Sequence, residues 1–346
     1  MAVKTEDIAK RTGLSKMTVS RVLNNHPYVK EETRKRVMEA MQDMGFRPNM
    51  MARRFFTGKT QLVGLIIPLE FMFSSFYFKE LCQGIMEYLE GCEYDVLLHN
   101  SRSARITAEN KCIELVKGKL VDGLLVAAPM ADDTYPSRLT KDDVPLVVLG
   151  EAVNQGEVNR VGIPNRQSVC KAVEQLIGLG HRRIAILTYG SDHVESNERL
   201  AGYREALQKK SVPVDESLIV EAKFSRSMAV EETKRLIQAN GDVTAIVAAN
   251  VDMALGAAEA IRSMGRTIPK DISLIAFDDN VELEAHDPPI TAIKQFPYTV
   301  GYAAAEMLLS ILKAGELPVK PFCKLIDTEY IERQSVSVPP SSRRSG

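Results

Sequence analysis

The stretch TEDIAKRTGLSKMTVSRVLN, residues 5–24, decides how the first part of the chain folds. Thr5 precedes two acidic residues and a short amphipathic segment, as a helix N-cap does, and Gly13 supplies the positive φ that ends a helix. Ser15 is placed to cap a second helix that runs to the end of the stretch. Together with a third helix expected over residues 31–44, this order is the pattern of a helix-turn-helix.

The beginning of the chain is basic, although the whole sequence of 346 residues has a formal net charge of only −1. Residues 1–60 hold 13 Lys and Arg residues against 6 Asp and Glu residues, so the remainder is acidic. This asymmetry indicates a nucleic-acid-binding module joined to a domain with another task. A merely solvated helical face is the alternative that charge alone leaves open.

The connector FRPNMMARRFFTGK, residues 46–59, is too basic and too aromatic for an inert linker. Asn49 is placed to cap a short helix that ends at Gly58. We interpret the segment as a minor-groove element, in which arginines contact phosphates and an apolar side chain wedges into a base step. A linker that docks its phenylalanines on the body is the alternative.

From residue 62 the sequence alternates apolar strands with amphipathic helices, which predicts parallel sheets covered on both faces. A change in loop length around residues 150–165 suggests two subdomains with a cleft, where ligands bind beyond the carboxyl ends of the strands. The tail SVSVPPSSRRSG is expected to be disordered. The expected strands are Leu62–Ile67, Tyr94–His99, Asp122–Ala127, Pro145–Leu149, Ile184–Thr188, Thr244–Ala249, Ile272–Phe277 and Lys324–Tyr330.

Several classes of protein are disfavoured. The N-terminus has no apolar signal-peptide core, no apolar run reaches membrane-spanning length, and the five cysteines form no C-x-x-C pair, so we expect a cytoplasmic protein without membrane contact. A solute-binding protein would need a signal sequence and has no use for residues 1–60. No nucleophile elbow, phosphate-binding loop or zinc motif is present, and the histidines are scattered. We therefore expect no enzyme activity, no cofactor and no metal, although Asp278 and Asp279 leave a metal pair conceivable beside hydroxyl recognition or helix capping.

The residues also carry a resemblance. Residues 5–49 resemble the DNA-binding head of the LacI/GalR (lactose-repressor type) transcription regulators, and the match continues through N-x-x-A-R-x-F-x-x-G-K into the body segments NERLAGYREAL, AANVDMALGAAEAI, IPKDISLIAFDD and PPITAIKQF. The resemblance implies an all-α helix-turn-helix head and an α/β, periplasmic-binding-protein-like body of two Rossmann-like parallel-sheet subdomains. It divides the chain into a DNA-binding domain (1–48), a hinge helix and linker (49–60), an effector-binding and dimerisation domain (61–334) and the tail (335–346), with the chain crossing between subdomains near 163, 293 and 323.

The resemblance further implies a homodimer that binds a pseudo-palindromic double-stranded DNA operator, most simply as a repressor. Lys16 and Met17 occupy the positions that choose the operator, Arg21 reads a base edge or a phosphate, and the hydroxyl and amide side chains anchor phosphates. In the hinge, Phe55 stands where the family usually has a leucine wedge. The residues assigned to DNA are Thr5, Ser15, Lys16, Met17, Thr18, Ser20, Arg21, Asn24, Tyr28, Thr33, Asn49, Ala52, Arg53 and Phe55.

In the body the resemblance implies a small-molecule effector, a sugar or sugar derivative, bound in the cleft. Arg199 matches the family arginine that clamps ligand hydroxyls or carboxylate, and Asp278 matches the aspartate that receives sugar hydroxyls. A structural role is the alternative for each. The residues assigned to the effector are Ser75, Tyr77, Arg199, Phe224, Asn250, Asp278 and Phe296.

Three positions depart from the family pattern. Gly150 and Val251 stand where the family has acids, and Pro164 replaces an aspartate. Either the effector is not an ordinary hexose, which we prefer, or the pocket is degenerate and a protein partner controls the regulator.

Overall fold

The computed structural model describes residues 3–23, 28–46, 59–69, 75–102, 106–151, 155–315 and 317–340. The chain divides into two compact units, Met1–Gln61 and Leu62–Gly346. The hinge prediction, with Asn49, Ala52, Arg53 and Phe55, and the contact predicted for Asn24 lie outside the described residues.

The described residues of the first unit form three short helices, α1 (Thr5–Thr12), α2 (Lys16–Leu23) and α3 (Glu31–Asp43). They close around a small core to which all three contribute. The core side chains are Ile8, Val19, Val22, Val37, Ala40 and Met41. Gly13 ends α1 with φ of 64°, as predicted.

The prediction that Thr5 caps the first helix is wrong. Lys4 is the N-cap, and Thr5 is already helical. The backbone N–H of Lys4 donates to the Asp7 carboxylate at 2.8 Å, so this acid draws the helix start one residue earlier.

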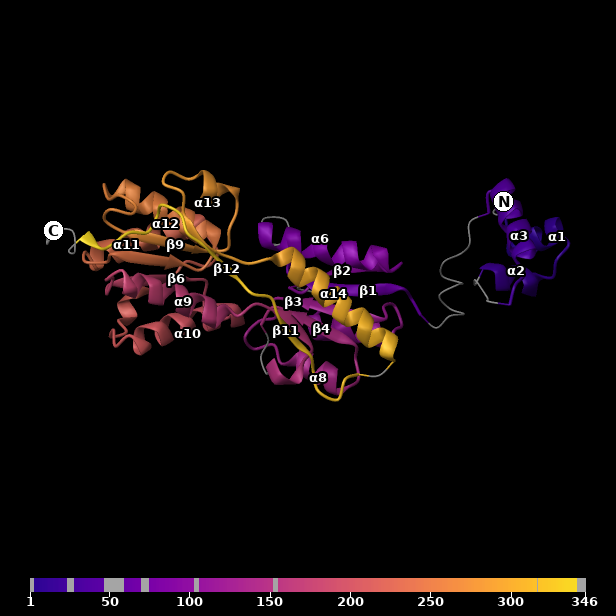
Figure 1. The fold of residues 1–346 in the computed structure, drawn as a ribbon. Helices are drawn as coiled ribbons and strands as arrows, with labels where there is room; N and C mark the ends of the chain where they lie inside the picture. Colours follow the sequence, from indigo (N-terminus) through magenta and orange to yellow (C-terminus); the bar gives the residue numbers. More distant parts are fainter. Residues whose placement is uncertain are drawn as a thin grey trace. The chain divides into compact units, whose positions relative to one another are not determined.

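The second unit contains two six-stranded sheets (Figure 1). The first sheet has the order β11-β5-β4-β3-β1-β2 and is parallel throughout. The second has the order β12-β10-β9-β8-β6-β7, with only β12 antiparallel. The strands are β1 (Leu62–Ile67), β2 (Asp95–Asn100), β3 (Gly123–Ala127), β4 (Leu146–Leu149), β5 (Arg160–Gly162), β6 (Ile184–Thr188), β7 (Ile219–Glu221), β8 (Ala245–Ala248), β9 (Ser273–Phe277), β10 (Thr291–Lys294), β11 (Cys323–Leu325) and β12 (Glu329–Ile331).

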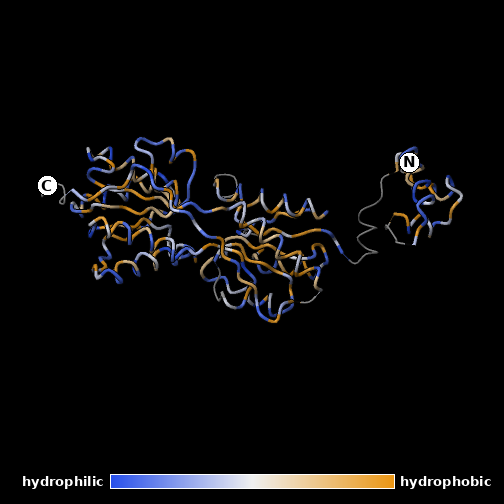
Figure 2. The backbone as a smooth tube through the Cα atoms, in the orientation of Figure 1, coloured by the Kyte–Doolittle hydropathy of each residue, from blue (hydrophilic) through white to orange (hydrophobic). Residues whose placement is uncertain are grey.

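Helices lie on both faces of the sheets, and Figure 2 shows the hydrophobic residues concentrated along the strands between them. The strands are almost continuous apolar runs because both faces are covered: all of β3, β6 and β9 is buried. The helices are α6 (Phe76–Gly91), α7 (Ala108–Lys117), α8 (Tyr135–Lys141), α9 (Asn165–Gly178), α10 (Val194–Lys209), α11 (Arg226–Ala239), α12 (Val251–Ser263), α13 (Val281–Ala285) and α14 (Pro297–Ala314). None of the described helices is long and apolar enough to cross a lipid bilayer.

The chain passes between the two sheets three times (Figure 1). It leaves the first sheet between β5 and α9, returns between β10 and α14, and leaves again between β11 and β12. The single strand predicted over Lys324–Tyr330 is therefore wrong: this segment divides into β11 and β12, which belong to different sheets.

The C-terminal segment also differs from the disordered tail that we predicted from residue 335. Ser335 is fully buried, and its hydroxyl accepts from the Thr291 N–H at 2.8 Å while donating to the Leu274 carbonyl. The Ser337 carbonyl accepts a hydrogen bond from the His181 imidazole Nε2 at 2.8 Å. Residues 335–340 are held because they satisfy backbone groups of two strands, and residues 341–346 lie outside the described residues.

Candidate functional site

The outer face of α2 carries four of the side chains that we assigned to DNA. Ser15 caps this helix, because its hydroxyl accepts the Thr18 N–H at 3.1 Å. Val19 and Val22 turn into the core of the head. The opposite side of the helix therefore presents Lys16, Met17, Ser20 and Arg21 outward, with Met17 65% exposed and Arg21 exposed.

The remaining described DNA candidates are Thr5, Thr18, Tyr28 and Thr33, and the Thr18 hydroxyl lies 2.9 Å from that of Ser15. Tyr28 is 90% exposed, whereas Thr33 and Thr5 are half-buried at the starts of α3 and α1. Lys16 is not simply solvated, because its ammonium lies 2.7 Å from the Glu6 carboxylate. This contact with Lys16 also lowers the pKa of Glu6. An exposed pair of this kind stabilises the head little, so Lys16 can exchange Glu6 for another acceptor at small cost.

In the body, a cavity of about 240 Å³ opens where strands of both sheets end. Parallel strands bring their carboxyl ends to the same edge, so residues that follow β4, β6, β8 and β9 converge on it. Of the seven predicted effector residues, six line the cavity: Ser75, Tyr77, Arg199, Phe224, Asn250 and Asp278. The other lining residues are Phe78, Leu81, Arg102, Ala127, Ala128, Leu149, Gly150, Gly162, Ile163, Asn165, Tyr189, His193, Glu195, Asp252 and Gln295.

The prediction that Phe296 lines the cavity is wrong. Its neighbour Gln295 takes that place, while the Phe296 ring lies 5.5 Å from the ammonium of Lys294. Successive side chains of an extended segment point to opposite sides, and the chain after β10 is extended until Pro297 begins α14. The motif therefore identified the right segment and the wrong one of two adjacent residues.

Arg199 is a buried cation that the walls of the cavity hold in place. Its Nε donates to the Asn165 side chain at 2.8 Å, and Nη1 donates to the Ala249 carbonyl. The guanidinium carbon lies 3.6 Å from the centre of the Phe277 ring. Arg199 thus combines two tasks, because it links the start of α9 to the end of β8 and also lines the cavity.

Three rings form one aromatic wall. Tyr189 and Phe224 stack with their centroids 4.0 Å apart, and His193 meets both rings edge-on. Phe224 adopts φ of 54°, an uncommon conformation for a bulky side chain, which turns its ring toward Tyr189. Burial lowers the pKa of His193 to about 4, so this imidazole is neutral at physiological pH.

Asp278 and Asn250 supply polar groups from the ends of β9 and β8. Asp278 accepts a short hydrogen bond from the Gln295 amide, and burial, opposed by Arg199, raises its pKa to about 6. Asn250 caps α12 by accepting the Met253 N–H at 2.8 Å, and it also lines the cavity. The structural and the ligand-facing interpretations of Asn250 are therefore compatible.

Glu195 is a lining residue that the sequence analysis missed. It lies in the first turn of α10, one turn before Arg199, so both side chains share one face of the helix. That i, i+4 spacing was the available signal. Burial raises the pKa of Glu195 to about 7 despite the opposing field of Arg199.

The three departures from the family pattern fall in different places. Gly150 lines the cavity with φ of 101°. Val251 lies outside the lining, but its neighbour Asp252 contributes a carboxylate there. Pro164 also lies outside it, between the lining residues Ile163 and Asn165. No group of three or more potential metal ligands occurs among the described residues.

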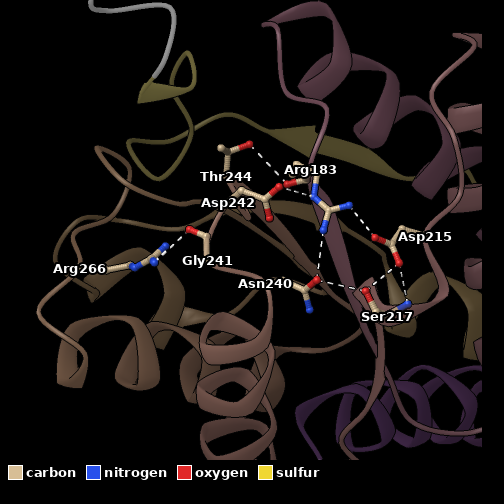
Figure 3. Close-up of polar contacts among 8 residues, drawn as sticks. All are labelled: Arg183, Asp215, Ser217, Asn240, Gly241, Asp242, Thr244 and Arg266. Atoms are coloured by element: carbon tan, nitrogen blue, oxygen red, sulfur yellow. Dashed lines mark hydrogen bonds and ion pairs between the residues drawn. The ribbon is translucent and has the colours of Figure 1, made fainter.

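A second polar cluster lies at the opposite end of the second sheet, before β6, β7 and β8 (Figure 3). Arg183 donates to Asp215 at 2.6 Å and to the Asn240 side chain at 3.1 Å, and it pairs with Asp242 at 3.0 Å. Arg266 donates to the Gly241 carbonyl at 3.1 Å. Arg183 forms ion pairs with both Asp215 and Asp242. The cluster therefore connects the loops that precede β6, β7 and β8.

The sequence and the fold were compared with known proteins. A profile described as bacterial regulatory proteins of the lacI family matches residues 4–49, and one described as a periplasmic binding protein-like domain matches residues 173–336. The chain is 31% identical over 344 residues to the HTH-type transcriptional regulator AscG of Escherichia coli, covering 96% of this chain and 98% of that protein. It is 31% identical over 309 residues to catabolite control protein A of Priestia megaterium, covering 89% and 92%.

Two solved structures cover nearly the whole chain. The lac repressor dimer bound to operator and the anti-inducer ONPF superimposes with a TM-score of 0.86 at 25% identity, covering 97% of this chain and 100% of that one. The complex of the transcriptional regulator CelR with cellobiose gives a TM-score of 0.73 at 28% identity, covering 96% and 99%.

Proposed function

Because the chain belongs to the LacI family of DNA-binding transcriptional regulators, we propose that it binds a pseudo-palindromic operator as a homodimer and that a small molecule in the body cavity controls this binding. The observation that carries the proposal is that one chain holds both an exposed face on α2 and a cavity lined by aromatic rings and several polar groups. Such walls are typical of sites that bind small molecules.

For the head, we assign base recognition to Lys16, Met17 and Arg21. Lys16 offers a donor, Met17 an apolar contact and Arg21 a bidentate guanidinium. Phosphate contacts are assigned to the side chains Thr5, Ser15, Thr18, Ser20, Asn24, Tyr28, Thr33, Asn49 and Arg53. The hinge roles of Ala52 and Phe55 stay predictions from the family resemblance.

The homodimer is supported by the edge of the first sheet. The outermost strand β2 exposes Leu97 at 36% and Leu98 at 43%, and Met86 on the neighbouring α6 is 52% exposed. An edge strand with exposed apolar side chains is unfavourable in water on an isolated protomer. A second copy of the chain that covers the strand removes this apolar surface from water. The solved lac repressor that superimposes on this chain is itself described as a dimer.

For regulation, the cavity lies between subdomains that three crossing segments connect. A ligand that binds one relative orientation of the subdomains more tightly shifts the population toward it. The ligand therefore acts on DNA binding only through its differential affinity for the two orientations.

Two measurements test the proposal. Arg21→Ala should relax operator specificity at one base position, at a cost of about 1–3 kcal/mol, whereas Arg53→Ala should weaken binding to all sequences and reduce the salt dependence. Equal losses on every operator for both variants would contradict the assignment. A thermal-shift screen of sugars, sugar acids, sugar phosphates and nucleosides tests the cavity, because a ligand at about a hundred times its Kd stabilises by about 2.7 kcal/mol. A blank screen of a well-folded protein would favour control by a protein partner.

A further inference from the structure

Glu195 fills a space that a missing side chain leaves open. A Cβ atom placed on Gly150 would lie 2.7 Å from Glu195 Oε1, closer than real contacts allow. The same oxygen accepts the Glu151 N–H at 3.4 Å. Glu195 therefore reaches from α10, beside the second sheet, to the end of β4 in the first sheet, where Gly150 leaves room for its carboxylate.

No ion pair neutralises this carboxylate among the residues that the structure describes. Its nearest cation, Arg199, already directs two of its nitrogens to the Asn165 side chain and the Ala249 carbonyl. Burial accordingly outweighs the attraction to Arg199 and raises the pKa of Glu195. The charged groups that act on Glu195 or on its neighbours Tyr77, Tyr189 and His193 are Arg102, Glu151, Asp192, Arg199 and Asp278.

Aromatic rings surround the same space. Tyr189 and Phe224 contribute stacked rings from the second subdomain, with the Arg199 guanidinium 5.6 Å from the Tyr189 centroid, and Tyr77 and Phe78 contribute an edge-on pair from the first. Ring faces attract a desolvated cation through their quadrupole, and an unpaired carboxylate attracts it through its charge. A neutral hydroxyl group can donate a hydrogen bond to the carboxylate, but it carries no charge for the ring quadrupole to attract.

Building on the proposed role of this cavity as the effector site, we propose that the effector carries a basic nitrogen, which Glu195 binds as an ammonium group against the Tyr189 and Phe224 rings. Asp278 and Asn250 then accept hydrogen bonds from the remaining polar groups of the ligand. A neutral polyol and a carboxylate-bearing compound are the two competing ligand classes.

The test uses the full-length protein and pairs of compounds that differ by one amine. The pairs are glucosamine with glucose, galactosamine with galactose, mannosamine with mannose, and 4-aminobutanol with butanediol, and glucuronate represents the carboxylate-bearing class. Calorimetric titration should give at least one amine a Kd about tenfold or more below that of its partner. Because the ammonium favours ionised Glu195, binding should also release protons, which appears as a difference in heat between buffers of different ionisation enthalpy.

Two variants decide whether Glu195 is responsible. Glu195→Gln keeps the size of the side chain and should weaken binding of the amine by about thirtyfold, because a desolvated charge pair is lost. Glu198→Gln, on the same helix but outside the cavity lining, should leave the affinity unchanged. Operator binding by both variants verifies that they are folded.

Three results would overturn the inference. One is tighter binding of the neutral compound or of glucuronate, and another is an amine affinity that Glu195→Gln leaves unchanged. The third is an absence of binding by every compound, in which case the cavity also fails as an effector site. Operator binding, measured separately, then shows whether the DNA-binding half of the proposed function survives.

Discussion

Replacing Glu195 by Gln should change how the stability of the body depends on pH. In the unfolded chain this carboxyl titrates near 4.5, and burial in the folded protein raises its pKa to about 7. Between these values the unfolded state ionises while the folded state keeps its proton. The folded state therefore binds more protons, and its stability falls as the pH rises from about 4.5 to about 7.

The size of the effect follows from the shift. Each pKa unit corresponds to about 1.4 kcal/mol, so the whole shift gives at most about 3 kcal/mol, since the side chain is only half-buried. Between about pH 5 and about pH 8 the loss is about 2.5 kcal/mol. Glutamine does not titrate. The free energy of unfolding of Glu195→Gln should therefore rise by this amount relative to that of the unmodified protein over that pH range. The pKa of Asp278 is also raised, to about 6, so this residue adds a similar pH dependence to the stability of both proteins. Its contribution therefore cancels in the comparison.

Differential scanning calorimetry of the full chain measures this difference. The Tm of Glu195→Gln minus that of the unmodified protein should rise by about 5 °C from pH 5 to pH 8 for the body transition. Glu198→Gln, on the same helix, serves as the matched control and should give a difference that does not depend on pH in this way. Parallel curves for Glu195→Gln and the unmodified protein would refute the reasoning that Glu195 is a desolvated, unpaired carboxylate.

Three further substitutions test the packing around the cavity and the C-terminal segment. Gly150→Ala should destabilise the body by about 1–3 kcal/mol, because its φ of 101° is strained for alanine and the new Cβ meets Glu195; a stability equal to that of the parent in urea unfolding would contradict the close approach. Arg160→Met should cost about 3–5 kcal/mol in the same assay, because it leaves the Glu151 carboxylate, 2.9 Å away and 6% exposed, buried without its cation. Ser335→Ala should cost about 1–3 kcal/mol by removing a buried hydroxyl that bonds to β9 and β10, and a neutral effect would return this segment to the status of a loose tail.

The long elements were predictable from the sequence because hydrophobic periodicity specifies them over many residues. The predicted strand Leu62–Ile67 is β1 with the same bounds. The three-residue strands β5 and β7 are too short to carry a period, and neither was predicted. The segment around β11 and β12 misled the prediction because one apolar run serves two sheets.

The sequence predicts where the cavity lies, but it does not predict all of the groups that line it. Residues that follow parallel strands meet at one edge, so Asn250 and Asp278 could be assigned to the same place without knowledge of any contact. The local direction of the backbone then determines which of two adjacent side chains points into the cavity, and here it is Gln295 rather than Phe296. The close approach of Glu195 to Gly150 was beyond the sequence, because the two residues are far apart in the chain and only the structure brings them together. Gly150 therefore does not by itself mark a degenerate pocket, because Glu195 supplies a carboxylate beside it in a cavity that aromatic rings also line. This arrangement supports a change of ligand class rather than a loss of ligand binding.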